Sequence, residues 1–175
     1  MDRHCHAYEW TGRDKLTYLW ALSPFLVAFI GALALIATIS VYWSIALLAV
    51  YLLGNLFQAG CCIGCPYRGR YCPALFGIFL ANFLSARIYR DREHDQRFFD
   101  RCAALAETTV VIISIGCCLL LFTIHWALAI LFLTLGALHL YLFFRRICPK
   151  CGYNETCPAG RAAVPRASRH PECRG

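Results

Sequence analysis

Two long stretches of the chain hold almost no charged residue, and they dominate its pattern of hydrophobic and polar positions. Residues 16–60 contain no Lys, Arg, Asp or Glu, and residues 107–144 contain only Glu107, at their edge. About 20 consecutive apolar residues are enough to cross a bilayer, so each stretch can cross twice. The pattern therefore predicts an integral membrane protein that lies in a lipid bilayer.

Each stretch is expected to break once, where aromatic, hydroxyl or His residues that suit the membrane interface interrupt the aliphatic run. The breaks fall near residues 40–44 and 123–126, and a Trp accompanies each. The expected fold class is therefore all-α, a four-helix transmembrane bundle made of two helical hairpins. The predicted helices are 17–40, 43–60, 104–123 and 126–144.

The two hairpins also suggest a duplicated parallel repeat. Trp43 precedes Cys65 by 22 residues, and Trp126 precedes Cys148 by 22 residues. When the halves are aligned on their cysteine patterns instead, they slip by about three residues. Chance similarity between two apolar hairpins therefore stays open as the alternative.

Positive charge predicts the orientation. The 17 Lys and Arg residues fall in three segments, 1–15, 61–106 and 145–175, which share one side of the membrane if the chain crosses four times. Because positively charged loops face the cytoplasm, we expect both termini and the Cys loops to be cytoplasmic, in a prokaryotic inner membrane. Topology and anionic lipids account for the net charge of +7, so no nucleic-acid partner is expected.

Two cysteine clusters follow the second and fourth predicted helices, in loops 61–73 and 148–158. Their patterns are Cys62-x2-Cys65-x6-Cys72 and Cys148-x2-Cys151-x5-Cys157, and Pro-Ala follows the last Cys of each. The cytosol keeps thiols reduced, and clustered cytosolic cysteines are typical of metal sites or catalytic thiols. We therefore expect a cytoplasmic Cys-rich cap that binds metal.

Each cluster supplies three thiols, whereas zinc and iron–sulfur sites usually take four ligands. Cys61 adjoins the first cluster, and Cys5 lies in a His-Cys-His segment near the start of the chain. One shared site with a CxxC from each loop and two separate sites are both open. The predicted metal ligands are Cys62, Cys65, Cys72, Cys148, Cys151, Cys157, Cys61 and Cys5.

The residues beside the cysteines fit two kinds of metal site, an iron–sulfur cluster and a zinc site. Four of the cysteines precede Pro, as the last Cys of a ferredoxin cluster run does, which favours an iron–sulfur cluster; the sequence Cys148-Pro-Lys-Cys151-Gly resembles a zinc-ribbon knuckle equally well. More broadly, the chain resembles small Cys-rich prokaryotic integral membrane proteins that carry a Cys-Pro-Tyr-x-Gly…Cys loop and a Cys-Pro-x-Cys…Cys-Pro segment. That resemblance covers the two loops only and implies no function.

The rest of the chain supplies a short apolar stretch, a polar C-terminal segment and two single residues within the helices. Residues 75–86 are apolar but too short to span, so a re-entrant or interfacial helix is expected there, and residues 160–175 are expected to form a flexible tail. His139 is expected to bond between helices, and Cys117 to pack as a small apolar residue.

Together these features predict a membrane-embedded redox protein that carries iron–sulfur clusters at its cytoplasmic face for electron transfer. It would be a subunit or partner of a larger membrane complex and would exchange electrons with a quinone or a redox partner protein. The alternatives are a zinc-stabilised structural or accessory subunit without catalysis, and a protein that transports soft metals or thiols.

Overall fold

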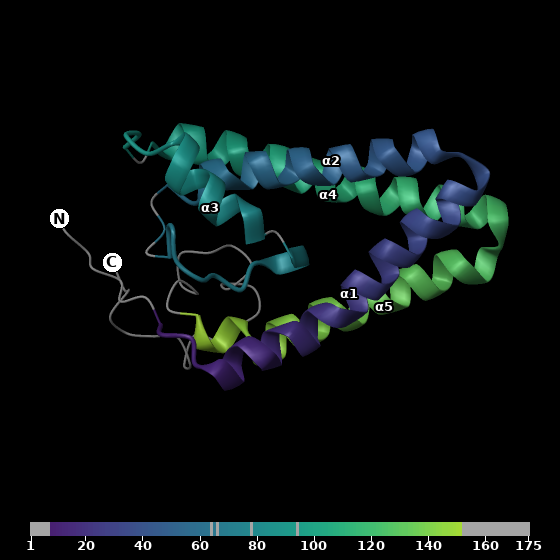
Figure 1. Cartoon of the computed structure of the whole chain (residues 1–175), viewed down its shortest axis with the longest axis horizontal. Coiled ribbons are helices and arrows are strands. Elements are labelled where there is room, and N and C mark those ends of the chain that lie inside the picture. Colours follow the sequence, from purple (N-terminus) through teal and green to yellow (C-terminus); the bar gives the residue numbers. More distant parts are fainter. Residues whose placement is uncertain (1–7, 64, 66, 78, 94, 152–175) are drawn as a thin grey trace.

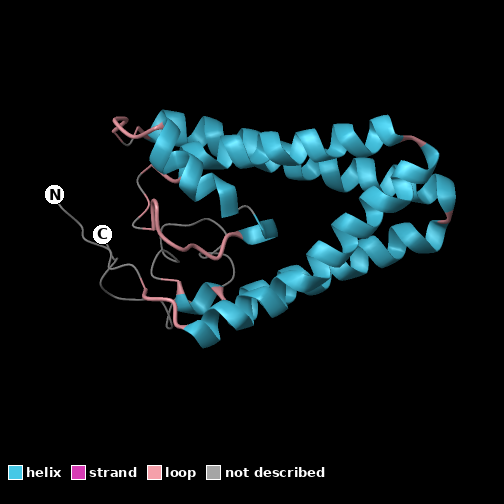
Figure 2. Ribbon diagram, in the orientation of Figure 1, coloured by secondary structure: helices cyan, strands magenta, loops and turns pink. Residues whose placement is uncertain are grey.

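The computed structural model describes residues 8–63, 65, 67–77, 79–93 and 95–151, and over these residues the chain is helical, with no strand (Figure 2). Four of its helices are long and apolar enough to cross a membrane, as predicted. The elements are α1 (Gly12–Ile39), α2 (Val41–Cys61), η1 (Leu75–Gly77), α3 (Phe79–Ile88), α4 (Gln96–Ile124), α5 (Trp126–Arg146) and η2 (Cys148–Lys150).

The four long helices form two pairs. Helix α2 lies along α4, and α1 lies along α5; the pairs meet at the end that holds the hairpin turns and separate toward the end where α1 begins and α5 ends (Figure 1). η1 and α3 lie between the separated pairs (Figure 1). Each pair therefore joins one helix from the first hairpin to one from the second, which is the pairing that a twofold axis along the membrane normal would produce.

Both hairpins turn at a single residue. Ser40 separates α1 from α2, and His125 separates α4 from α5; both have extended backbones, with φ of −157° and −163°. The helices before the turns have 28 and 29 residues, and those after the turns have 21 residues each. When the two halves are aligned on these turns, their cysteine patterns are offset by one residue, whereas alignment on the Trp residues offsets them by about three. The smaller offset strengthens the case for duplication.

The outer faces of the long helices are apolar. Side chains such as Trp20, Ile30 and Leu119 are 60%, 62% and 64% exposed, and similar residues continue along all four helices. A water-soluble protein does not tolerate apolar surface on this scale, whereas lipid chains cover it at no cost. Surface and helix length thus agree on an integral membrane protein.

Helix α4 begins earlier than its apolar stretch. It starts at Gln96, capped by the side chain of Asp95, which accepts a hydrogen bond from the Arg97 amide at 3.0 Å. The predicted span began at residue 104, so α4 carries about two charged turns before its apolar part. Hydropathy locates the part of a helix that lipid covers, not where the helix begins.

Candidate functional site

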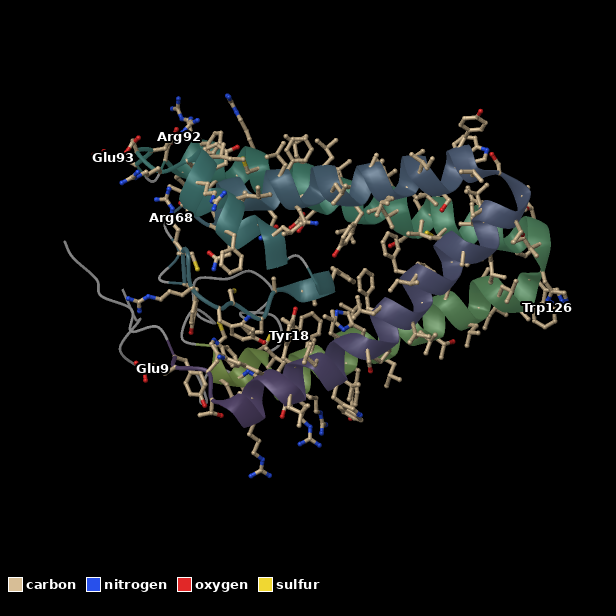
Figure 3. All side chains as sticks on the ribbon, viewed as in Figure 1. Glu9, Tyr18, Arg68, Arg92, Glu93 and Trp126 are labelled. Atoms are coloured by element: carbon tan, nitrogen blue, oxygen red, sulfur yellow. The ribbon has the colours of Figure 1, made fainter. Side chains whose placement is uncertain are left out.

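The two cysteine loops lie at the same end of the molecule. Figure 3 shows Glu9, Arg68, Arg92 and Glu93 near that end, with Trp126 at the opposite end. Among the described residues, all Lys and Arg side chains belong to segments at the Cys-bearing end. This separation of charge is what places both loops on one side of a membrane.

The first loop is organised around Asn82 of α3, whose side chain is 5% exposed. Its Oδ1 accepts from the Gly69 amide at 3.2 Å, and its Nδ2 donates to the carbonyls of Tyr67 and Arg70. Three backbone groups between Cys65 and Cys72 thus bond to one side chain. Asn82 fixes the path of this loop.

Arg68 attaches the same loop to the other end of α3. Its guanidinium donates to the carbonyl of Ser85 at 3.1 Å and to that of Tyr89. A cation at the C-terminal end of a helix also interacts favourably with the helix dipole. The Cys65–Cys72 segment is therefore held along the length of α3.

A second polar cluster lies at the start of α1. Asp14 is 5% exposed; its Oδ2 accepts from the hydroxyls of Thr11 at 2.7 Å and Tyr8 at 3.0 Å, and its Oδ1 lies 2.6 Å from Lys150 Nζ. Lys150 belongs to η2, between Cys148 and Cys151. The ion pair therefore fastens the second cysteine turn to the beginning of α1.

The two cysteine loops meet through this cluster. The Tyr8 amide donates to the hydroxyl of Tyr67 at 2.8 Å. Tyr67 belongs to the first cysteine loop, between Cys65 and Cys72 in the chain. Tyr8 also contacts Asp14, and Asp14 contacts Lys150. A continuous path of hydrogen bonds thus links the two loops. The hydrogen bond from the Tyr8 hydroxyl to the Asp14 carboxylate also raises the pKa of Tyr8.

Deeper between the helix pairs, η1 forms a clamped turn. Phe76 has φ 57° and ψ 23°, a left-handed conformation that is unusual for a bulky residue. Its amide donates to His139 Nε2 at 3.3 Å, and its carbonyl accepts from the Tyr51 hydroxyl at 3.1 Å. Strain of this kind persists only where the surroundings hold it, and here α5 and α2 do so.

His139 bonds between helices, as predicted. It is fully buried, and its Nδ1 lies 2.8 Å from the carbonyl of Ala21 in α1. With Nδ1 protonated, the neutral ring donates to Ala21 and accepts from η1, so both ring nitrogens are satisfied.

Pro24 interrupts the hydrogen bonds of α1, because it has no amide N–H to donate to the carbonyl of Trp20. The Ser23 hydroxyl donates to that carbonyl instead, at 2.8 Å.

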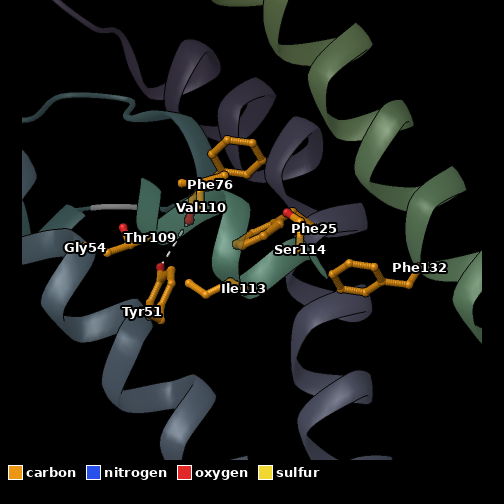
Figure 4. A pocket seen from close by; sticks show the side chains of 9 residues that line it. All are labelled: Phe25, Tyr51, Gly54, Phe76, Thr109, Val110, Ile113, Ser114 and Phe132. Carbon is orange, nitrogen blue, oxygen red and sulfur yellow. Dashed lines mark hydrogen bonds between the residues drawn. The ribbon is translucent and has the colours of Figure 1, made fainter. Parts of the chain in front are cut away.

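Beside this turn lies a small pocket, lined mainly by apolar side chains (Figure 4). Its volume of about 30 Å³ holds one or two water molecules, which is far less than a quinone ring needs. The Tyr51 hydroxyl reaches the η1 backbone beside it (Figure 4). The lining residues are Phe25, Tyr51, Gly54, Phe76, Thr109, Val110, Ile113, Ser114 and Phe132.

The predicted ligands fall into two groups. Six of them are described, and all six lie at the Cys-bearing end: Cys61, Cys62, Cys65, Cys72, Cys148 and Cys151. Within the described part of the chain, no three or more His, Cys, Asp or Glu side chains are gathered in a way that could hold a metal ion. Cys5, Cys157 and the predicted tail lie outside the described residues.

Burial shapes the chemistry of the thiols. It raises the pKa of Cys62 to about 12, although Arg68 nearby acts in the opposite direction. A metal bound there would have to displace this proton, because the thiolate is the form that coordinates. Cys117, in the middle of α4, is fully buried in the apolar core, as expected of a packing residue.

Sequence reasoning missed Asn82, Asp14 and Lys150 as organisers of the site. A polar residue within the short apolar stretch and a Lys between two cysteines were the available signals. No family model, curated protein or solved structure matches the chain.

Proposed function

We propose that this protein is a membrane-embedded metal-binding redox protein, with an iron–sulfur cluster held by its cysteine loops. The observation that carries the proposal is the hydrogen-bonded path from Tyr67 through Tyr8 and Asp14 to Lys150. It joins two thiol-rich turns that lie more than 70 residues apart in the sequence. Thiolate is the ligand type that suits iron–sulfur clusters, zinc and Cu(I).

The ligand set would combine thiols from both loops: Cys62, Cys65, Cys72, Cys148, Cys151 and Cys157, with Cys61 and Cys5 as further candidates. The described thiols alone do not complete a site, so the proposal requires Cys157 or Cys5 to supply ligands. Metal binding would then link the chain ends to the loops through these ligands, because ligation and local folding are coupled.

A zinc-stabilised accessory subunit is the second candidate, and the η2 turn favours it. Cys148 and Cys151 are joined by a tight backbone turn, in which the Cys151 amide donates to the Cys148 carbonyl at 3.2 Å. Zinc knuckles use a CxxC turn of this kind, from which two thiolates can bind one ion. Zinc would stabilise the cap without electron transfer.

The proposed location is a prokaryotic inner membrane, with the Cys-bearing end in the cytoplasm, where electrons would pass to a quinone or a redox partner protein. Tyr42 is 86% exposed beside the turn at Ser40. In intact cells, Tyr42→Cys should be labelled by a membrane-impermeant maleimide. Labelling of Arg92→Cys, at the proposed cytoplasmic end, and not of Tyr42→Cys would show that the protein has the opposite orientation.

Anaerobic purification followed by elemental analysis tests the metal. An iron–sulfur protein is brown and contains iron and acid-labile sulfide, whereas a zinc protein is colourless with stoichiometric zinc. Cys65→Ser and Cys151→Ser should each lower the metal content, and the matched control Cys118→Ser, in the middle of α4, should not. Protein that carries neither metal nor sulfide when prepared without oxygen would exclude both forms of the proposal.

A further inference from the structure

Cys61 and Cys102 lie near one another where the last turn of α2 packs tightly against α4. A Cβ added at Gly60 would overlap the sulfur of Cys102 and stand 3.0 Å from its Cβ. Only glycine leaves room for such contact, so Gly60 sets how near the two helices come. Position 61, the next residue of α2, carries a sulfur at this point of contact.

The side chains point to the same turn of α4. Cys61 Sγ is 3.9 Å from the carbonyl oxygen of Phe99, three residues before Cys102. Side chains on a helix lean toward its N-terminus, so the side chain of Cys102 leans over the turn that contains Phe99. Both thiols therefore lie at the same turn of α4, where it packs against the end of α2.

The two thiols differ in access. Cys102 is 6% exposed, whereas Cys61 is only partly buried, and both are reduced in the structure. A disulfide needs Cβ atoms about 3.5–4.5 Å apart. Residue 61 follows Gly60, which faces Cys102, so closing the bond requires the last turn of α2 to rotate toward Cys102. One reachable and one sheltered thiol form the arrangement in which the first attacks and the second resolves.

We propose that Cys61 and Cys102 are a redox-active dithiol that exchanges two electrons with low-molecular-weight disulfides. The Cys61 thiolate attacks one sulfur of the small disulfide, whose S–S bond breaks and whose other half leaves as a thiol after taking a proton. Cys102, on losing its proton, then attacks the Cys61 sulfur and releases the second small thiol. Two protein thiols become one disulfide, and one small disulfide becomes two thiols.

This site goes beyond the proposed metal function and does not rest on it. The pair uses α2 and α4, whereas the metal proposal uses mainly the loops that follow α2 and α5 and shares only the candidate ligand Cys61 with the pair. Oxidation would join the first hairpin covalently to the second, immediately before the first cysteine loop. Cys61 would then act as a redox thiol and not as a metal ligand.

The experiment equilibrates the full-length protein in detergent with buffers of reduced and oxidised glutathione, then traps free thiols and maps linked peptides by mass spectrometry. The wild type should form the Cys61–Cys102 disulfide. Cys102→Ser should accumulate glutathione on Cys61 at least tenfold over the wild type, and Cys61→Ser should leave Cys102 reduced. Cys118→Ser should behave as the wild type does.

Gly60→Ala provides a second test, because the added methyl group would force the helices apart and should slow closure of the disulfide at least tenfold. Pairing of Cys61 with Cys62 or Cys65 in the wild type, or a Cys102 that stays reduced at every glutathione ratio, would overturn the proposal. Metal content of the same samples reports separately on the loops. If the anaerobically purified wild type carries no metal before the glutathione step and still forms the Cys61–Cys102 disulfide, the metal function alone is refuted.

Discussion

Replacing Asn82 with Ala should release the loop between Cys65 and Cys72 without unfolding the bundle. The substitution removes three hydrogen bonds to the backbone of this loop. Tyr67 is 2% exposed, but its carbonyl keeps the hydrogen bond from the Arg70 amide at 2.9 Å, so loss of the Asn82 bond there costs about 0.5–1.5 kcal/mol. Gly69 and Arg70 are exposed, so water can replace their lost bonds, at about 0.5–1.5 kcal/mol each.

The total for the three bonds is about 1.5–4.5 kcal/mol, and a value near 3 kcal/mol corresponds to about a hundredfold more frequent opening of the loop. Hydrogen exchange followed by mass spectrometry measures this opening directly. The amides of Gly69 and Arg70, which bond to Asn82 Oδ1 and the Tyr67 carbonyl, should exchange about a hundredfold faster. Amides in the middle of α2 and α4 should keep their protection.

Asn55→Ala is the matched control. Asn55 is 1% exposed, but its Nδ2 bonds only within its own helix, to the Tyr51 carbonyl at 3.0 Å, and its Oδ1 has no hydrogen-bond partner. Its replacement should leave exchange of the loop unchanged. Equal exchange in Asn82→Ala and the wild type, or an equal effect of Asn55→Ala, would show that Asn82 does not organise the loop.

Three further predictions concern stability, measured as the melting temperature in detergent. Lys150→Met should cost about 1–2 kcal/mol, because the buried carboxylate of Asp14 loses its cation while Lys150 itself is half exposed; an unchanged melting temperature at low salt would contradict this. Gly54→Ala should cost about 1–3 kcal/mol, since its Cβ would stand 2.6 Å from a threonine oxygen of α4, whereas Gly31→Ala, with open space around it, should cost nothing. His139→Leu should cost about 2–4 kcal/mol, because it leaves buried backbone groups of α1 and η1 without partners, and equal stability of that variant and the wild type would refute the bridging role.

The helices were predictable because apolar length reports directly on bilayer thickness. The breaks at Ser40 and His125 fell within the predicted segments, and a lone His on an apolar helix was correctly expected to bond between helices. Each of these inferences depends on local composition alone. That is why they needed no knowledge of how the helices are arranged.

The arrangement of the site could not be predicted in this way. Asn82 finds its partners only once α3 packs between the helix pairs, and nothing in its sequence neighbours specifies which carbonyls it will meet. The proximity of Cys61 and Cys102 depends on the register of α2 against α4, which Gly60 sets. Contacts between distant segments follow from packing, and packing is not written in local hydropathy.

The two single-residue turns limit what the protein can do on that side of the membrane. Ser40 and His125 leave no loop there that could bind a solute, dock a protein or close over a ligand. Whatever the protein accepts and whatever it delivers must therefore use the Cys-bearing face or arrive sideways through the lipid. If the protein carries electrons as proposed, it would return them to the side that supplied them unless a membrane-soluble molecule takes them away.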